Sequence, residues 1–221
     1  MDVQEVVKQR RSIRQFLHKP VPEETIKDIV SDALWAPSWG NTQPWEIVVV
    51  TGDKLAQFKK ENVEALTSGA AMTHEVIIPE VWPDSLKQRY KDVGKSVLGS
   101  LEIARGDVEG RTRYYGEMFS FFNAPAILMF LVDREVSLEY AMLDIGSILQ
   151  TTCLLAQDKG LGTCILAASI NYASIARKLL EVPDNKRIII GTALGWPDNN
   201  AAVNHFKRER GELDEFVRWV K

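Results

Sequence analysis

The sequence predicts a mixed α and β fold, arranged as one domain over residues 1–221 with an inserted excursion. Its 221 residues are enough to bury a large core. Apolar residues recur at helical spacing in several segments, and short runs rich in valine and isoleucine lie between them. The pattern weakens over residues 67–116, which we interpret as an excursion from the core and a candidate lid, with a plain surface decoration as the alternative.

Apolar spacing and capping residues together indicate six helices. They are expected over residues 2–9, 22–35, 53–66, 86–101, 138–159 and 171–180. Pro22 suits a first helical position, Asp53 and Asn171 are expected N-caps, and Gly160 is expected to end the helix over residues 138–159. That last helix is apolar almost all round, so we expect it to be buried on several sides.

Short apolar runs predict four strands. They are expected over residues 45–50, 126–132, 163–166 and 187–194. The first strand follows a loop at residues 36–44 that is dense in turn formers and in amide and hydroxyl groups. The final segment, residues 213–220, is short and partly apolar, and we expect it to pack against a second copy of the chain.

Composition narrows the class of protein. The net charge is −3 and positive charge gathers near the two termini, so we expect no nucleic-acid surface. The longest apolar run, residues 124–132, is far shorter than the roughly 20 residues of a membrane span, so we expect no membrane partner. The N-terminus lacks a signal-sequence pattern, and Cys153 and Cys164 stand in apolar context as expected free thiols. A cytoplasmic protein fits these observations.

The motif that carries chemistry is a run of arginines. Arg10, Arg11 and Arg14 surround Ser12, and Arg208 and Arg210 form a second basic group near the other end of the chain. Guanidinium groups match phosphate oxygens two at a time, so the run suits a phosphate monoester, with a solvated basic face as the alternative.

The sequence lacks the usual catalytic constellations. His18, His74 and His205 lie far apart, and none is spaced with Cys or a carboxylate as metal ligands would be. A nucleophile elbow, a phosphate loop and a complete dinucleotide fingerprint are also missing. Phosphate-binding arginines without acid–base residues suit a protein whose bound cofactor supplies the chemistry.

Several motifs together resemble the FMN-dependent nitroreductase family. They begin with Arg10-Arg11-Ser12-Ile13-Arg14 and continue with the Ala36 to Trp45 loop and the valine-rich strand behind it. The later ones are Gly160-Leu161-Gly162-Thr163-Cys164, the strand that ends in Gly195-Trp196-Pro197, and Arg208-x-Arg210. The resemblance spans nearly the whole chain and is weakest over residues 67–116.

The resemblance implies an α+β sandwich with a central mixed, mainly antiparallel sheet flanked by helices. It also implies a domain-swapped homodimer with two tightly bound FMN molecules at the subunit interface. The resemblance implies three groups of cofactor contacts. Both chain ends would contact the phosphate, ribityl chain and pyrimidine edge of FMN, through Arg10, Arg11, Ser12, Arg14, Arg208 and Arg210. The other subunit would contact the flavin ring through Pro37, Ser38 and Asn41, and backbone groups of Ile165, Leu166 and Ala167 would lie beside the reactive flavin nitrogen.

The resemblance implies a ping-pong oxidoreductase with no catalytic side chain of its own. NADH or NADPH would bind transiently and reduce FMN. A nitroaromatic, quinone or similar planar acceptor would then replace the nicotinamide on the same face of the flavin. Trp39, where many members are small, and Tyr114, Phe119 and Phe122 are the substrate-side candidates, with core packing as the alternative for the last three. A flavin-dependent dehalogenase or dehydrogenase of the same superfamily, and a non-catalytic flavin-binding protein, are the competing functions.

Overall fold

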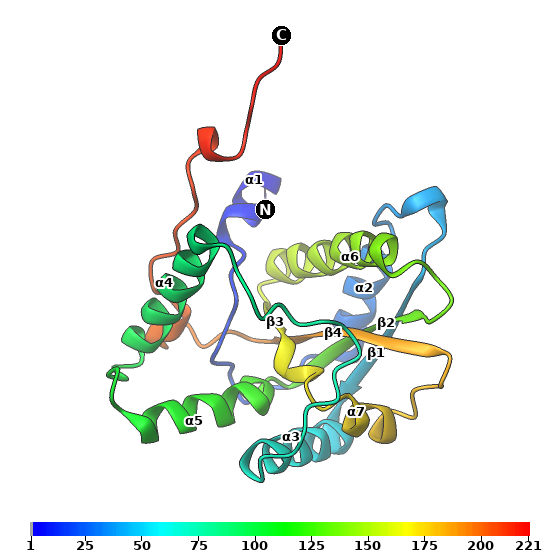
Figure 1. The fold of residues 1–221 in the computed structure, drawn as a ribbon. Helices are drawn as coiled ribbons and strands as arrows, with labels where there is room; N and C mark the ends of the chain where they lie inside the picture. The colour runs from blue at the N-terminus through cyan, green and yellow to red at the C-terminus, as the bar shows by residue number, and fades with distance from the viewer. Residues whose placement is uncertain (1) are drawn as a thin grey trace.

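The computed structural model describes residues 2–221 and contains a four-stranded antiparallel sheet (Figure 1). Its strands are β1 (Trp45–Thr51), β2 (Ala126–Asp133), β3 (Gly162–Leu166) and β4 (Lys186–Gly195). They lie in the order β1-β2-β4-β3, and each neighbouring pair is antiparallel. Ser12 adds a parallel bridge to Thr163 beside β3, so the sheet is mixed and mainly antiparallel, as expected.

Strand β2 divides the core into two layers. Successive side chains of a strand point to opposite faces of the sheet. Ile127 and Met129 accordingly pack in one hydrophobic cluster, and Leu128 and Phe130 pack in the other. Because both faces are covered by helices, β2 is apolar without alternation, which explains the continuous run in its sequence.

Seven helices surround the sheet within residues 2–221. They are α1 (Val3–Gln9), α2 (Glu23–Ala33), α3 (Gly52–Thr67), α4 (Asp84–Ser100), α5 (Val108–Phe119), α6 (Leu138–Asp158) and α7 (Ala173–Leu179). Helices α2 and α6 cover one face of the sheet, and α3 and α7 cover the other (Figure 1). Helix α6 buries eight of its residues, in line with the apolar sequence that predicted a helix buried on several sides.

Several predicted helix ends differ from the structure. Pro22 is the N-cap of α2 rather than its first residue, and Asp53 lies inside the first turn of α3, whose N-cap is Thr51. Asn171 precedes Tyr172, the N-cap of α7, and its backbone carbonyl accepts a hydrogen bond from Thr73 instead. Gly160 follows the end of α6 at a φ of 74°, a left-handed conformation that favours glycine, as expected.

The predicted excursion contains two helices, α4 and α5, of which the sequence indicated only α4. The segment that leads to α4 is fixed to the sheet by Glu75, whose side chain is 12% exposed. Its carboxylate accepts hydrogen bonds from Arg134 (2.5 Å), Arg177 (2.9 Å) and the Ile188 N–H (2.7 Å). The excursion is therefore tied to β4 and α7 before α4 begins.

The C-terminal segment extends away from the helices beside α1 (Figure 1). Past the 3₁₀ turn at Leu213–Glu215, it carries Phe216, Trp219 and Val220 with exposed side chains. Among the residues described, none belongs to a helix with the length and apolar character needed to cross a membrane.

Candidate functional site

The arginine run lies against the edge strand β3. After α1 ends, the Ile13 N–H donates to the Thr163 carbonyl over 2.9 Å, which fixes the run beside the strand. Gly162 makes this approach possible, because a Cβ there would lie 2.4 Å from Ile13 Cγ1. The side chain of Ile13 is buried in the core, so its neighbours on the run are held at the surface of the sheet edge.

Asn204 joins the two ends of the chain. Its side chain is buried, and Oδ1 accepts a hydrogen bond from the Arg14 N–H over 2.8 Å. Nδ2 donates to the Gln15 carbonyl over 2.8 Å and to the Asp198 carbonyl over 3.0 Å. These three bonds fix the distance between the N-terminal arginine run and the segment that carries Arg208 and Arg210.

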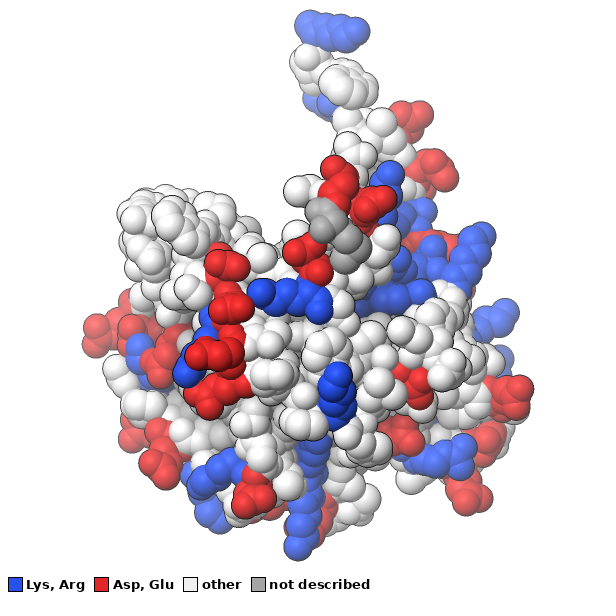
Figure 2. Space-filling model, turned by 180° about the vertical axis from the view of Figure 1, so that it is seen from behind, with Lys and Arg blue, Asp and Glu red and all other residues white. Residues whose placement is uncertain are grey.

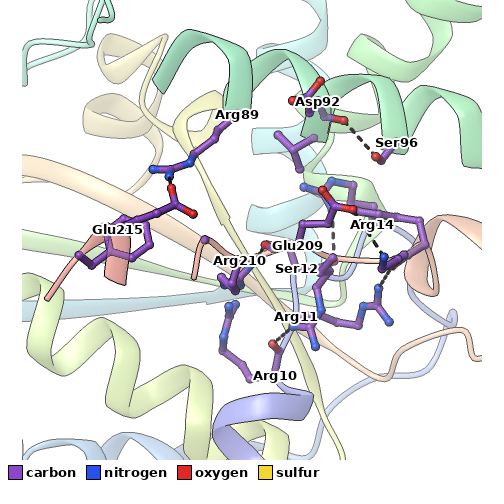
Figure 3. Close-up of a pocket in the computed structure, with 16 residues that line it drawn as sticks. Arg10, Arg11, Ser12, Arg14, Arg89, Asp92, Ser96, Glu209, Arg210 and Glu215 are labelled. Atoms are coloured by element: carbon purple, nitrogen blue, oxygen red, sulfur yellow. Dashed lines mark hydrogen bonds and ion pairs between the residues drawn. The ribbon is translucent and has the colours of Figure 1, made fainter. Parts of the chain in front are cut away.

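The two basic groups predicted from the sequence line one cavity of about 590 Å³ (Figure 3). The predicted residues in its wall are Arg10, Arg11, Ser12, Arg14, Arg208 and Arg210. Arg208 donates to the backbone carbonyls of Arg10 and of Lys8, the second over 2.6 Å, and Arg11 donates to the Phe206 carbonyl. Segments almost two hundred residues apart in sequence thus form a single wall.

The cavity keeps an excess of positive charge, because seven basic side chains and three carboxylates line it. Within residues 2–221, no ion pair joins any of the five arginines to a carboxylate. Burial lowers the pKa of Arg11 and of Arg208, and repulsion from neighbouring guanidinium groups lowers both further. Figure 2 shows basic side chains gathered at the base of the projecting C-terminal segment. Uncompensated guanidinium groups around a cavity form a receptor for an anion such as a phosphate.

An aromatic ring supports two of the arginines. The guanidinium carbons of Arg11 and Arg14 lie 5.6 and 5.7 Å from the centre of the Phe206 ring. Cation–π contact stabilises each by about 0.5–1 kcal/mol at a partly exposed site. The ring therefore holds two like charges on one side of the cavity.

The remaining predicted cofactor residues lie outside this cavity. Pro37, Ser38 and Asn41 belong to the loop between α2 and β1, which lies at the N-terminal end of α6, away from the arginines (Figure 1). Ile165, Leu166 and Ala167 form the end of β3 and the turn after it. Ile165 is 41% exposed, whereas the other residues of β3 are buried. An uncovered apolar surface therefore lies on β3, the strand beside which the arginine run lies.

The four substrate-side candidates occupy three different environments. Trp39 is exposed, and its ring packs beside the Tyr140 ring with 5.6 Å between the ring centres. Burial raises the pKa of Tyr114, and the neighbouring Arg14 guanidinium offsets part of that rise, so this hydroxyl lies close to the arginine run. Phe119 and Phe122 are buried in hydrophobic clusters and do not line the cavity, so their surroundings favour the packing alternative.

Sequence reasoning missed the outer wall of the cavity. Four residues of α4 and the residues around the 3₁₀ turn of the C-terminal segment complete it. They are Arg89, Asp92, Val93 and Ser96, and Gly211, Glu215 and Phe216. The α4 residues are spaced i, i+3, i+4 and i+7, so they share one helix face. That spacing was readable in the sequence, but a polar face looks the same whether it meets solvent or a ligand.

Metal chemistry has no support in the residues described. Within residues 2–221, no three His, Cys, Asp or Glu side chains come together in a way that could hold a metal ion. Cys153 and Cys164 are buried free thiols, as predicted, and burial raises the pKa of Cys164 to about 11. Burial raises the pKa of Cys153 as well, and neither cysteine lines the cavity.

The fold and the site define a class of protein: an α+β chain with an arginine-lined cavity for a phosphate-bearing ligand. Residues 7–196 match the sequence profile of the Nitroreductase family. The chain is 37% identical to the chloronitrobenzene nitroreductase of Comamonas testosteroni, over 99% of this chain and 96% of that protein. It is 34% identical to the 4-nitrobenzoate reductase of Pseudomonas putida, with the same coverage.

The fold agrees with these sequence matches. The crystal structure of the FMN- and NADPH-dependent nitroreductase NfnB from Sphigopyxis sp. strain HMH superposes with a TM-score of 0.94 at 31% identity, covering 100% of both chains. The chain therefore belongs to the nitroreductase family, as the motifs in its sequence indicated.

Proposed function

We propose that this protein is an FMN-dependent oxidoreductase that uses NADPH or NADH to reduce nitroaromatic compounds. The observation that carries the proposal is the cavity in which five arginines meet and, within residues 2–221, form no ion pair with the three carboxylates that share its wall. The relatives support the acceptor class, since the two most similar ones described above are named for nitroaromatic substrates.

The residues of the cavity fit the FMN phosphate. Four of the arginines, Arg11, Arg14, Arg208 and Arg210, donate to backbone carbonyls and keep further N–H donors for a ligand, and Ser12 adds a neutral hydroxyl. The flavin ring would then lie along the end of β3, over the uncovered Ile165, beside the backbone of Leu166 and Ala167. When bound, FMN supplies the redox chemistry, accepting hydride from the nicotinamide and passing electrons to the acceptor.

The chain leaves one apolar face for two ligands. Trp39 is held by a hydrogen bond of 2.9 Å from its N–H to the buried Asp144, and the backbone of Asn41 and Gln43 has positive φ. Such strain in non-glycine residues persists where packing holds a loop in one conformation. We infer that this rigid loop offers its indole to planar molecules, so nicotinamide and acceptor, quinones included, use one face in turn by a ping-pong mechanism.

We further propose that the protein is a homodimer in which the loop of one subunit faces the flavin of the other. The free edge of β1 lies beside an apolar groove of about 730 Å³ that α2 also lines. Figure 2 shows that the protrusion at the upper left carries little charge, whereas the projecting C-terminal segment bears charged side chains next to its exposed apolar ones, Phe216, Trp219 and Val220. In the dimer, the exposed apolar side chains of the C-terminal segment would pack in this groove of the second subunit, beside the free edge of β1. Deletion of residues 217–221 is therefore expected to give a monomer in size-exclusion chromatography with light scattering.

The buried free thiols support a reducing compartment, so we place the protein in the cytoplasm.

The first test is an absorbance spectrum of the purified protein followed by anaerobic addition of NADPH and then a nitroaromatic. Flavin bands that bleach with NADPH and return with the acceptor are the expected result. Arg208→Ala is expected to weaken FMN binding at least about tenfold, because a hydrogen bond to a charged group contributes about 1.5–3 kcal/mol. The exposed Lys60 of α3, which does not line the cavity, provides the control variant Lys60→Ala.

Two results would contradict the proposal. Flavin that stays oxidised with both NADH and NADPH would leave a flavin-binding protein without this activity. A protein that binds no FMN, or an Arg208→Ala variant that binds it as well as the Lys60→Ala control, would remove the role given to the arginine cavity.

A further inference from the structure

The segment that carries Arg208 and Arg210 has no regular structure to hold it. Residues 207–211 run between the 3₁₀ turns at Ala202–Asn204 and Leu213–Glu215, outside any helix or strand. Their guanidinium groups face those of the N-terminal run, and like charges at this distance push the two segments apart. Such a segment must be fixed at both ends if its arginines are to stay around one anion.

The upstream end of the segment is fixed by Asn204 and by the bond from Arg11 to the Phe206 carbonyl. The downstream end is held by three side chains, Arg89, Glu215 and Phe216, which we call the Arg89 clamp. Arg89 of α4 forms an ion pair with Glu215 Oε2 and lies 5.0 Å from the centre of the Phe216 ring. Figure 3 shows Arg89 reaching across the cavity to Glu215.

The clamp is joined to the arginine segment through backbone contacts. Glu215 Oε1 accepts a hydrogen bond from the Glu212 N–H over 2.9 Å, which closes the turn. The Phe216 ring covers Gly211, where a Cβ would lie 2.5 Å from the ring. Gly211 directly follows Arg210, so the position of the ring sets where the second arginine leaves the cavity wall.

We propose that Arg89 is a positioning residue for the cofactor phosphate, acting through Glu215 and Phe216 on the segment that carries Arg208 and Arg210. This inference rests on the proposed function, because it takes the cavity to hold the FMN phosphate. The clamp also ties α4, which closes the outer wall of the cavity, to the C-terminal segment. Flavin release would then require the clamp to open.

Charge counting and the clamp make opposite predictions for Glu215. Removing a negative charge from the wall of an anion site strengthens anion binding if only net charge matters. The clamp predicts the reverse, since Glu215→Gln removes the acceptor that holds Arg89. Glu209→Gln is the matched control, because Glu209 lines the same cavity but pairs only with Lys207, at 3.6 Å.

The experiment measures the dissociation constants of FMN and of riboflavin for the full-length apoprotein by flavin fluorescence. Riboflavin lacks the phosphate, so it reports on the ring site alone. Glu215→Gln removes the half-exposed ion pair and is expected to raise the FMN dissociation constant about threefold to fivefold, with riboflavin unchanged. Arg89→Ala also removes the cation–π contact to Phe216 and should raise it about fivefold to tenfold, and Arg89→Lys should recover most of the affinity.

Several outcomes would overturn the inference. FMN binding by Glu215→Gln that is unchanged or tighter, as expected for Glu209→Gln, would show that charge alone decides affinity. An equal loss for FMN and riboflavin would show that the clamp shapes the whole cavity. If Arg208→Ala abolishes the preference for FMN over riboflavin and Glu215→Gln does not, only the clamp is wrong. If the wild-type protein has no such preference, the phosphate site itself is wrong.

Discussion

Replacing Asn204 by alanine tests whether one buried amide holds the two halves of the arginine site together. The side chain makes three hydrogen bonds, to the Arg14 N–H and to the carbonyls of Gln15 and Asp198. Alanine cannot replace any of them, and the amide is enclosed by the segments that it joins. The variant therefore leaves the Arg14 N–H without its partner, while the Gln15 and Asp198 carbonyls each keep one backbone hydrogen bond, from the Asp198 and Ala201 N–H groups.

The expected loss of stability follows from these three bonds. Each contributes about 1 kcal/mol net, so Asn204→Ala should lower the free energy of unfolding by about 3 kcal/mol. Urea unfolding at a fixed protomer concentration measures this loss, because an oligomer's stability depends on concentration. FMN affinity should fall as well, because the segments that carry Arg14 and Arg208 are no longer joined through the Asn204 side chain.

The matched control is Asn199→Ala, which truncates an exposed asparagine five residues earlier. That variant should stay within about 0.5 kcal/mol of the parent. The reasoning is refuted if Asn204→Ala unfolds at the urea midpoint of the control. It is equally refuted if Asn204→Ala is destabilised as expected and yet binds FMN with unchanged affinity.

Three further predictions concern single contacts. Glu75→Gln should cost about 2 kcal/mol in urea unfolding, because two guanidinium groups and a strand N–H share that carboxylate, whereas the exposed Glu80→Gln should cost little. Gly162→Ala should cost about 1–3 kcal/mol and weaken FMN binding, since the added carbon would overlap the arginine run, while Gly94→Ala in α4 meets nothing within 4 Å. Burial raises the pKa of Cys164 to about 11, so the native thiol keeps its proton between about pH 8.5 and pH 11 while the unfolded thiol loses it. Stability should fall across that window, and the fall should be smaller in Cys164→Ala; equal slopes in urea midpoint against pH would contradict this.

The sheet was predictable because its strands are apolar in ways that only a covered sheet explains. The 126–132 run became β2, buried on both faces, and the predicted strand over residues 187–194 became β4 with one residue more at each end. Strong local signals, such as Gly160 after α6, also held. Helix starts were less predictable, because Asp53 and Thr51 are both good caps by type and only the tertiary contacts choose between them.

The arginines of the site were predictable because five of them in two short runs have few other uses. Their meeting in one cavity was not, because it depends on Asn204, whose type and neighbours give no local signal. Helix α5 was missed because Gly110 and Gly116 weaken its pattern, and its N-cap is Asp107, whose side chain accepts from the Gly110 N–H. The outer wall was missed because the polar face of α4 resembles a solvated one.

The same cavity explains why this protein should be more stable with its cofactor than without it. Five guanidinium groups held together without a carboxylate repel one another, and the folded chain bears that cost through Asn204, Phe206 and the Arg89 clamp. A bound phosphate would relieve the repulsion, so binding and folding favour the same arrangement. A carboxylate paired with these arginines would stabilise the empty protein and compete with the phosphate, whereas Glu209 and Glu215 in the same wall pair with Lys207 and Arg89 instead. The absence of such a carboxylate among the described ion pairs of these arginines is therefore what we expect of a site shaped for a ligand rather than for the stability of the chain alone.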